Sequence, residues 1–428
     1  MQSIYRIFSR HIVVSIILLF VFNTTGYSDG SSTMPDIIPG NFFAEGSIDF
    51  KAIAVDKSAK TAYLLKIEND TPVIIKRYTD ILTGEVNGDK AVEGDKKTPE
   101  GVYFTQSFIP KEKLTPTYGY GALPLNYPNF YDRILGKTGH GIWIHGVDDS
   151  IEDNSTEGCV ALKNGNMKDL VSQTDILTPV VIAEKLRFLD KDSYVIEKNR
   201  WLNFIKGFIN AWEKGDMDKF QTYIHTRFKN ADNQDIYKYL LEKKQLATLY
   251  PYRKINIDNI RIFLENENEG MADFKQLYCA SNIIVEGTKK LYISGELGEN
   301  KIIGELFYPD NSFDMTKRYI EEFINAWSLA WQSKNIDKYK SFYGNSFYSS
   351  GMDLENWLKD KDEKFKKYDF IKIEIDNLQI KNISPNETTI YFRQKFAADK
   401  YSDTGIKELI LKGCPGDFKI ISETWRPL

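Results

Sequence analysis

An internal repeat constrains the fold of this chain more than any other feature. The segment FINAW at residues 208–212 recurs at 323–327, a shift of 115, and DMDKF from residue 216 recurs as NIDKY from residue 335, a shift of 119. IDN at 257–259 recurs after 118 residues. A period near 118 is too long for a solenoid and indicates two tandem copies of one small domain. The four-residue difference between the first two shifts is about one helical turn.

Each copy is predicted to hold two helices followed by three or four strands. The first helix of the first copy carries an apolar stripe at helical spacing, formed by Leu202, Ile205, Phe208, Ile209 and Trp212. The strands of the second copy are predicted in FIKIEIDNLQI, TTIYFRQKFAA, GIKELILKG and DFKIISETW. Their alternating residues indicate a curved sheet with one face against the helices. This order of elements resembles the nuclear-transport-factor-like (SnoaL-like) cone fold.

The two copies are expected to be packing or binding modules. Cone-fold domains can be catalytic, but the second copy has no histidine and the first has only His225. We therefore expect them to position the rest of the chain by binding a glycan or a protein, or by forming a homodimer.

The N-terminus has the layout of a secretory signal peptide. Arg6, Arg10 and His11 precede an apolar stretch from residue 12 to residue 22, and small and polar residues follow. The stretch is about half of the roughly 20 residues that a spanning helix needs. We expect cleavage near residue 28 and export of the chain. An uncleaved membrane anchor is the alternative, because no A-x-A site follows.

Charge and cysteine count exclude two other classes of protein. The 56 basic and 60 acidic residues give a net charge of −4 and are dispersed along the chain, so no nucleic-acid-binding surface is expected. Three cysteines are an odd number, so an exported chain keeps at least one free thiol. A disulfide framework is therefore not expected to hold this protein together.

The segment IWIHGVDDSIEDNSTEGCVAL, residues 142–162, combines a histidine with a cysteine. Short β-rich pieces separated by turns lead up to it and predict an all-β sheet or sandwich. GIWIHG is predicted to be a strand ending at Gly146, and STEGCVAL a turn that leads into another strand. If these strands are neighbours, His145 can take the proton of the Cys159 thiol, while Gly158 leaves room for a substrate carbonyl. Backbone N–H groups at the turn can then bind an oxyanion.

Two other interpretations of this segment compete with the catalytic one. A single cysteine in a β-rich domain is often a small buried apolar residue, and the spacing to His145 alone does not exclude this. A metal site is not expected, because His140, His145 and Cys159 have no regular ligand spacing. No cofactor is predicted.

The segments around this motif resemble the L,D-transpeptidase (YkuD-like) catalytic domain. IHG followed by STEGCV is similar to the H-G…(S/T)-x-G-C signature of that family, and AVDKS, TGEVNGDKAVEGDKKTPEGVYF and GALPLNYPNFYDRILGKTGHGIWIHG match it in order and spacing over about residues 48–185. The resemblance implies a β-sandwich-like fold. The roles that it implies are nucleophile for Cys159, general base for His145, backbone carbonyl orienting the imidazole for Gly146, and glycine of the oxyanion turn for Gly158.

Other residues of the motif have less defined roles. Thr98 and Gly101 match the TPxG turn of the family, which we expect to be structural. Trp143 shares a strand face with His145 and is a candidate substrate-binding residue. His140 is a weaker candidate, because an odd separation of five residues places it on the opposite face of a regular strand from His145. We favour a non-catalytic role for His140.

The resemblance implies attack on peptidoglycan stem peptides. Cys159 would cleave the bond between meso-diaminopimelate and the terminal D-alanine of a tetrapeptide stem and form an acyl-enzyme. An amine acceptor makes the chain an L,D-transpeptidase, which is the leading prediction because the catalytic domain as a whole resembles that family. Water makes it an L,D-carboxypeptidase, which is the alternative. Ala161 stands where many members carry arginine, and the G-C-V-A-L form with a C-terminal cone domain is closer to the cell-shape L,D-carboxypeptidases of curved and helical bacteria. A non-catalytic cell-wall binding protein is the hypothesis of another class.

We therefore predict a multidomain, β-rich protein in the periplasm of a Gram-negative bacterium. Its catalytic domain is a YkuD-like β-sandwich, and two tandem α+β cone domains follow. The predicted boundaries are 1–28 for the signal peptide, 45–187 for the catalytic domain, 195–310 for the first cone-fold copy and 314–428 for the second.

Overall fold

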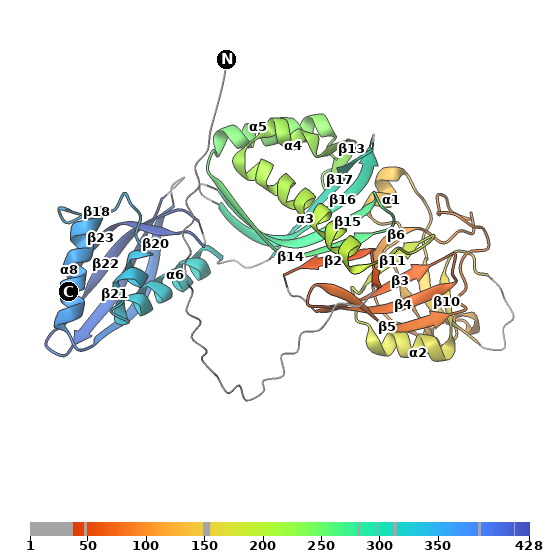
Figure 1. Cartoon of the computed structure of the whole chain (residues 1–428), viewed down its shortest axis with the longest axis horizontal. Helices are drawn as coiled ribbons and strands as arrows, with labels where there is room; N and C mark the ends of the chain where they lie inside the picture. Colours follow the sequence, from red (N-terminus) through yellow and green to blue (C-terminus); the bar gives the residue numbers. More distant parts are fainter. Residues whose placement is uncertain are drawn as a thin grey trace, which may run out of the picture. The chain divides into compact units, whose positions relative to one another are not determined.

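The computed structural model describes most of the chain after residue 36 (Figure 1). The described ranges are 37–46, 49–148, 155–280, 283–296, 298–310, 315–383, 387–414 and 416–428. The predicted signal peptide, residues 1–28, lies outside them. No helix within these ranges is long and apolar enough to cross a membrane.

Two sheets face each other in the N-terminal part and enclose its core. The five-stranded sheet has the order β5-β4-β3-β11-β6 and the four-stranded sheet the order β10-β9-β8-β7. The strands are β3 Phe50–Asp56, β4 Thr61–Glu68, β5 Thr71–Thr79, β6 Gly101–Phe104, β7 Ile109–Pro110, β8 Gly121–Pro124, β9 Trp143–Val147, β10 Val160–Lys163 and β11 Pro179–Ala183. Val55 and Ile182 of one sheet and Ile144 and Val160 of the other belong to one buried cluster. The predicted β-sandwich is confirmed.

Helices flank this sandwich at two places. The helix α2, Asn164–Gln173, follows the strand after the cysteine, and its Met167 and Leu170 enter the same core. α1, Phe130–Leu135, begins with a capping box, in which Asn129 and Asp132 exchange side-chain to backbone hydrogen bonds. The remaining short elements are β1 Ile38–Pro39, β12 Phe188–Leu189 and the 3-10 helices η1 Lys111–Lys113 and η2 Pro116–Tyr118.

The five-stranded sheet is buried on its second face as well. Ala52, Ala54 and Val181 point away from the sandwich core and pack in a cluster with Phe263 and Met271 of the first cone-fold copy. The strand β2, Phe42–Glu45, pairs antiparallel with β14 of that copy. The sequence did not reveal this pairing, because β2 lies at the boundary of the predicted catalytic domain and contacts residues more than 200 positions later.

The first cone-fold copy wraps a curved sheet around a long helix (Figure 1). Its elements are α3 Lys191–Lys214, α4 Met217–Thr222, β13 Ile224–Asn230, α5 Ile236–Leu249, β14 Arg253–Leu264, β15 Gly270–Ala280, β16 Ile283–Glu296 and β17 Glu299–Pro309. Asp190 caps α3 by accepting from the backbone N–H of Ser193. The predicted apolar stripe of this helix is buried along its whole length, which confirms the helical interpretation.

The second copy repeats this plan. Its elements are α6 Met315–Gln332, α7 Ile336–Lys340, β18 Tyr348–Ser349, β19 Met352–Asp353, α8 Leu354–Lys367, β20 Ile371–Ile383, β21 Glu387–Ala398, β22 Ser402–Lys412 and β23 Lys419–Pro427. All four predicted strands are present. The expectation of two helices per copy is wrong, because each copy has a third helix, α5 in the first copy and α8 in the second. Charged residues dominate α8, and only Trp357, Lys361 and Phe365 are buried, so its apolar stripe is narrow.

The first helices of the two copies are related by a shift of 119. α3 and α6 both end before a residue with positive φ, Gly215 and Lys334, which are 119 positions apart. Trp212 therefore corresponds to Trp331 and not to Trp327 of the second FINAW. The two FINAW segments lie one helical turn apart on the same helix face, which explains the shift of 115.

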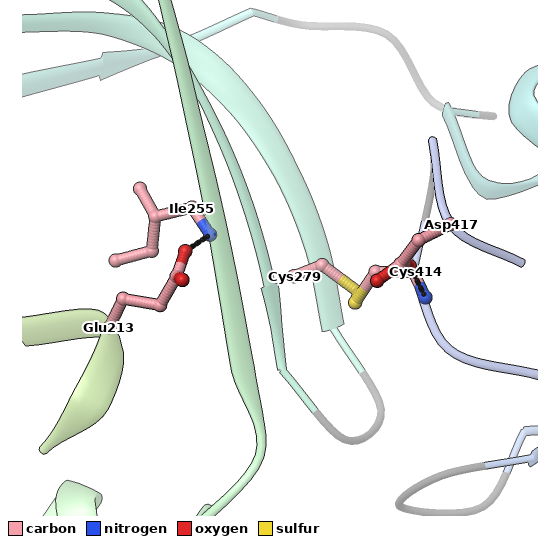
Figure 2. Close-up of a disulfide and its surroundings, with 5 residues drawn as sticks. All are labelled: Glu213, Ile255, Cys279, Cys414 and Asp417. Atoms are coloured by element: carbon pink, nitrogen blue, oxygen red, sulfur yellow. Dashed lines mark hydrogen bonds between the residues drawn. A yellow bond between two sulfur atoms is a disulfide. The ribbon is translucent and has the colours of Figure 1, made fainter. Parts of the chain in front are cut away.

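One disulfide links the two copies (Figure 2). It joins Cys279 in β15 to Cys414 after β22, two residues 135 positions apart. Beside it, the backbone N–H of Cys414 donates to Asp417 Oδ1 over 2.8 Å. Nearby, Glu213 accepts from the backbone N–H of Ile255 over 2.7 Å. Cys159 is free, so the expectation of an unpaired thiol is confirmed.

Candidate active site

Two neighbouring parallel strands bring the histidine and the cysteine of the motif together. In the pair β9 and β10, Ile144 lies opposite Val160 and His145 lies opposite Ala161. Ile144 and Val160 face the sandwich core, so His145 and the flanking Cys159 lie on the other face, because strand side chains alternate. Both line a cavity of about 420 Å³. The predicted adjacency of the two strands is confirmed.

The imidazole of His145 is held in one tautomer by the backbone. Its Nδ1 lies 2.7 Å from the carbonyl oxygen of Gly146. A carbonyl can only accept, so Nδ1 carries the hydrogen and Nε2 keeps a lone pair. His145 is 7% exposed, and burial lowers its pKa from the ordinary 6.5 even though the Gly146 hydrogen bond opposes this. The residue is therefore a neutral base at neutral pH.

The thiol of Cys159 is also neutral in the resting site. Burial raises its pKa from the ordinary 9.0, although a backbone hydrogen bond from Trp143 and the charge of Lys90 oppose this. The Sγ atom lies 3.5 Å from the carbonyl oxygen of Gly141, to which it donates. A neutral thiol beside a neutral imidazole requires proton transfer to occur during attack.

The turn before Cys159 is fixed by threonine hydroxyls. Thr156 Oγ1 donates to the carbonyl oxygen of Cys159 over 2.7 Å and accepts from the N–H of Gly158 over 3.1 Å. Thr98 of the TPxG turn also donates to the Cys159 carbonyl, over 3.4 Å. Among the described residues none accepts from the N–H of Cys159. That N–H is available to an incoming oxygen.

Gly158 is required by the backbone at this turn. Its φ is +133°, and a Cβ at this position would lie 2.8 Å from the carbonyl oxygen of Lys97. Residues with a side chain rarely adopt such a conformation. The sequence predicts that Gly158 makes room for the substrate. The structure gives two further reasons for a glycine at this position, its backbone conformation and its close packing against Lys97.

The two candidate substrate-binding residues lie outside the lining of this cavity. The Trp143 ring packs on Tyr118, with 4.9 Å between ring centroids. His140 is 84% exposed, and its Nε2 lies 3.7 Å from Glu93 Oε1. The strand predicted from Gly141 begins only at Trp143, because Gly139 and Gly141 have positive φ. The roles of Trp143 and His140 stay predictions.

Tyr118 is a residue of the site that the sequence did not indicate. Its ring meets the imidazole of His145 edge to face at 5.0 Å between centroids and shields it from solvent. It follows a Pro-Thr pair in a Gly-rich stretch, a pattern that is common in ordinary turns. Glu85, Thr117 and Glu157 line the same cavity from other loops. Within the described ranges no cluster of His, Cys, Asp and Glu side chains could hold a metal ion.

Family comparisons divide the chain into a catalytic and a C-terminal part. Residues 51–182 match the L,D-transpeptidase catalytic domain (YkuD). Residues 200–306 and 319–424 each match the Cds6 C-terminal NTF2-like domain. The second match repeats the first, as the internal repeat predicts.

Individual proteins are similar over different parts of the chain. YafK of Escherichia coli (strain K12), an L,D-transpeptidase by name, is 36% identical over 84 residues. The match spans 19% of this chain and 30% of that relative. Bd1075 of Bdellovibrio bacteriovorus has a TM-score of 0.59 at 26% identity, covering 65% of this chain and all of that one. The helical cell shape determining protein Pgp2 of Campylobacter jejuni has a TM-score of 0.53 at 27% identity, covering 62% of this chain and 95% of that one.

Proposed function

We propose that this chain, whose residues 51–182 belong to the L,D-transpeptidase (YkuD) catalytic-domain family, is a cysteine enzyme that modifies peptidoglycan. The observation that carries the proposal is the parallel pair β9 and β10. It places Cys159 and His145 on one wall of a cavity, with the lone pair of His145 on Nε2. A buried structural cysteine would require neither the cavity nor this tautomer.

The proposed reaction begins with the diaminopimelate–D-alanine bond of a tetrapeptide stem. His145 Nε2 takes the thiol proton as Cys159 Sγ bonds to the carbonyl carbon, and the carbonyl electron pair moves to oxygen. The N–H of Cys159 donates to this oxyanion. The C–N bond then breaks, D-alanine leaves with the proton from His145, and a thioester remains on Cys159. An acceptor then attacks the thioester carbonyl carbon and loses its proton to His145. The C–S bond breaks, and the Cys159 thiolate takes that proton from His145 and becomes a thiol again.

The acceptor decides between two reactions. An amine of a second stem gives a 3-3 cross-link, the L,D-transpeptidase reaction, and water gives a tripeptide, the L,D-carboxypeptidase reaction. Ala161 lines the cavity opposite His145, where an arginine would supply a fork for an anionic group. Its absence and the similarity to a cell shape determining protein support the carboxypeptidase as the second candidate.

Muropeptide analysis tests both candidates. Sacculi rich in tetrapeptides are incubated with the purified chain from residue 29 onward, and with its Cys159→Ala variant as control. Tripeptides alone indicate water as acceptor, and 3-3 linked dimers indicate an amine. If neither protein changes the sacculi, the chain is a non-catalytic cell-wall binding protein.

The proposed location is the periplasm of a Gram-negative bacterium, because the first 28 residues have the layout of a signal peptide. N-terminal sequencing of the protein from a periplasmic extract tests this. A mature chain that begins near residue 29 supports it. Retention of residue 1 in the membrane fraction would indicate the anchored alternative.

The two cone-fold copies are proposed to position the catalytic domain by binding a glycan or protein ligand or by forming a homodimer. Support comes from the cavities that both copies enclose. A chain shortened to residues 29–194, compared with the full chain for binding to sacculi, tests this role. Equal binding would contradict it.

A further inference from the structure

An open cavity of about 560 Å³ lies where α1 of the catalytic domain meets the first cone-fold copy. α1 contributes Phe130, Arg133 and Ile134 to its lining. The cone-fold copy contributes residues 226–231, which run through β13 into the loop after it, and two further residues of that loop. This α1–β13 cavity shares no lining residue with the cavity of Cys159 or with the interior cavity of the first copy. The proposed reaction therefore makes no use of it.

The lining of the α1–β13 cavity is positively charged. It holds three basic residues, Arg133, Arg227 and Lys229, and one acidic residue, Asp235. The carboxylate of Asp235 already caps α5, because its Oδ1 accepts from the backbone N–H of Lys238 over 2.9 Å. The whole chain has a net charge of −4, so a local excess of positive charge makes this cavity a place that attracts anions.

The three basic side chains have no carboxylate partner among the described residues. Arg133 Nη1 donates to the carbonyl oxygen of Pro128 over 2.7 Å. Arg227 Nη2 donates to the carbonyl oxygen of Ile134 over 3.1 Å, and Lys229 also donates to a backbone carbonyl. These partners carry no full charge. The other guanidinium N–H groups of both arginines have no acceptor in the described part of the chain, so their charge and most of their donors remain for a ligand.

The two guanidinium groups are held in place from different domains. The guanidinium of Arg133 lies over the ring of Phe130, 5.9 Å from its centroid, and that ring packs on Tyr292 at 5.5 Å. Arg227 belongs to β13, and its hydrogen bond to the Ile134 carbonyl crosses from the cone-fold copy to α1. Side chains that are already fixed lose less conformational entropy when a ligand binds. The pair is thus oriented before an anion arrives.

The second copy lacks these cations, although it repeats the same strand contact. Ile224 pairs in parallel with β17, and Tyr343 makes the equivalent bridge to β23, which gives a shift of 119 at this place. The positions of Arg227 and Lys229 then hold uncharged residues in the second copy, Ser346 and Tyr348. The cone fold itself therefore does not require a basic residue at either position. The cations occur in the copy that meets α1, which indicates a function at that contact.

The size and composition of the cavity fit a ligand with two acidic groups. Small-molecule sites usually measure about 300–1,000 Å³, so a cavity of 560 Å³ holds more than one phosphate or one carboxylate. Two guanidinium groups on different elements suit two carboxylates, each of which can accept two parallel hydrogen bonds from one arginine. Phe130 and Ile134 offer apolar surface to the atoms between the two carboxylates. A short acidic peptide has this arrangement.

We propose that the α1–β13 cavity is a second, non-catalytic binding site for a peptidoglycan stem peptide, in which Arg133 and Arg227 each bind one carboxylate. Two successive residues of a stem, D-glutamate and diaminopimelate, each carry a free carboxylate. Such a site holds one stem of the sacculus while Cys159 acts on another. The choice of ligand rests on the proposed function, whereas the site itself rests on the cavity and its charges.

Protection of the arginines from phenylglyoxal tests the inference on the native chain. Phenylglyoxal modifies exposed guanidinium groups, and both Arg133 and Arg227 are exposed. The chain from residue 29 onward is treated with and without the stem tripeptide L-Ala-γ-D-Glu-meso-diaminopimelate, which lacks the D-alanine bond and cannot be turned over. Peptide mass mapping then gives the modification rate of each arginine. Arg426, which is 71% exposed in the second copy, is the control in the same sample.

The expected result is protection of Arg133 and Arg227 with one common midpoint concentration, because one ligand covers both. At ten times that concentration each should react about tenfold more slowly, since only the free fraction is modified, and the rate at Arg426 should not change. The tripeptide with its carboxylates amidated should protect neither arginine. Arg227→Gln should raise the midpoint measured at Arg133 about tenfold or more, because a charge-assisted hydrogen bond is lost, and Arg426→Gln should leave it unchanged.

Several outcomes would overturn the inference. They are unprotected arginines at the cavity, equal protection by the amidated tripeptide, and equal slowing of the reaction at Arg426. N-acetyl-Glu-Glu amide is the comparison probe, and protection at a lower concentration than the tripeptide needs would identify an acidic protein segment as the ligand and overturn the assignment to peptidoglycan. The test does not involve Cys159. Turnover of sacculi without protection therefore contradicts the inference alone, and protection without turnover contradicts the proposed reaction alone.

Discussion

The Nδ1 atom of His145 donates to the carbonyl oxygen of Gly146, its neighbour in β9, over 2.7 Å. The group that orients the base is therefore a backbone carbonyl and carries no full charge. It fixes the tautomer but gives little stabilisation to an imidazolium. Burial consequently lowers the pKa of His145, and the site rests as a neutral pair.

Replacing the general base His145 should slow the reaction without weakening substrate binding. His145→Gln keeps a side chain of similar size but removes the proton acceptor, so kcat should fall by about 100-fold to 10,000-fold while KM changes little. Turnover of a tetrapeptide stem measures this. The thermal unfolding midpoint of the variant, compared with that of the wild type, serves as the folding control. Unchanged kcat would exclude His145 as the base.

The neutral pair predicts the pH dependence of the thiol. A raised pKa means that the thiol persists above pH 9.0, its ordinary midpoint, so the rate of Cys159 alkylation in the free enzyme should rise with pH up to and beyond that value. A lowered pKa of His145 places the acid limb of kcat/KM below 6.5. An alkylation rate that is already maximal near neutral pH would show a preformed thiolate and contradict this description.

Gly158→Ala tests the turn before the nucleophile. The positive φ and the approach to the Lys97 carbonyl should cost about 1–3 kcal/mol of unfolding free energy. The strain would shift Cys159 and lower kcat. Gly165→Ala, in α2 with nothing within 4 Å of its Cβ, is the matched control. Equal stability and activity of the two variants would show that the turn tolerates a side chain.

The disulfide should stabilise the second copy and leave catalysis intact. The double variant Cys279→Ser, Cys414→Ser should lose about 2–4 kcal/mol of unfolding free energy, the usual contribution of one disulfide. Its turnover should equal that of the wild type, because Cys159 is the free thiol. Peptide mapping under non-reducing conditions provides the direct check. A Cys159-containing disulfide in the active protein would contradict the assignment.

Local patterns made much of the architecture predictable. The alternation of apolar and polar residues in the second copy predicted all four of its long strands. The apolar stripe from Leu202 to Trp212 predicted the helix α3. The strands on either side of the His145 to Cys159 loop were also recognisable, because short apolar runs there end at glycines.

Long-range contacts were not predictable in the same way. The pairing of β2 with β14 and the disulfide from Cys279 to Cys414 depend on how whole domains meet, and no local pattern encodes this. α8 was missed because charged residues of both signs make up most of it, although Lys361 among them is buried. Tyr118 was missed because its contact with His145 joins the 3-10 helix η2 to the strand β9, and no local sequence pattern encodes that contact.

Trapping the covalent intermediate tests the central claim most directly. The chain from residue 29 onward is mixed with a disaccharide tetrapeptide, quenched in acid within the first turnover and weighed by intact-protein mass spectrometry. The account predicts a mass increase equal to the disaccharide tripeptide acyl group, mapped to Cys159 and absent from Cys159→Ser. Product formation without any adduct, or an adduct on another residue, would contradict it.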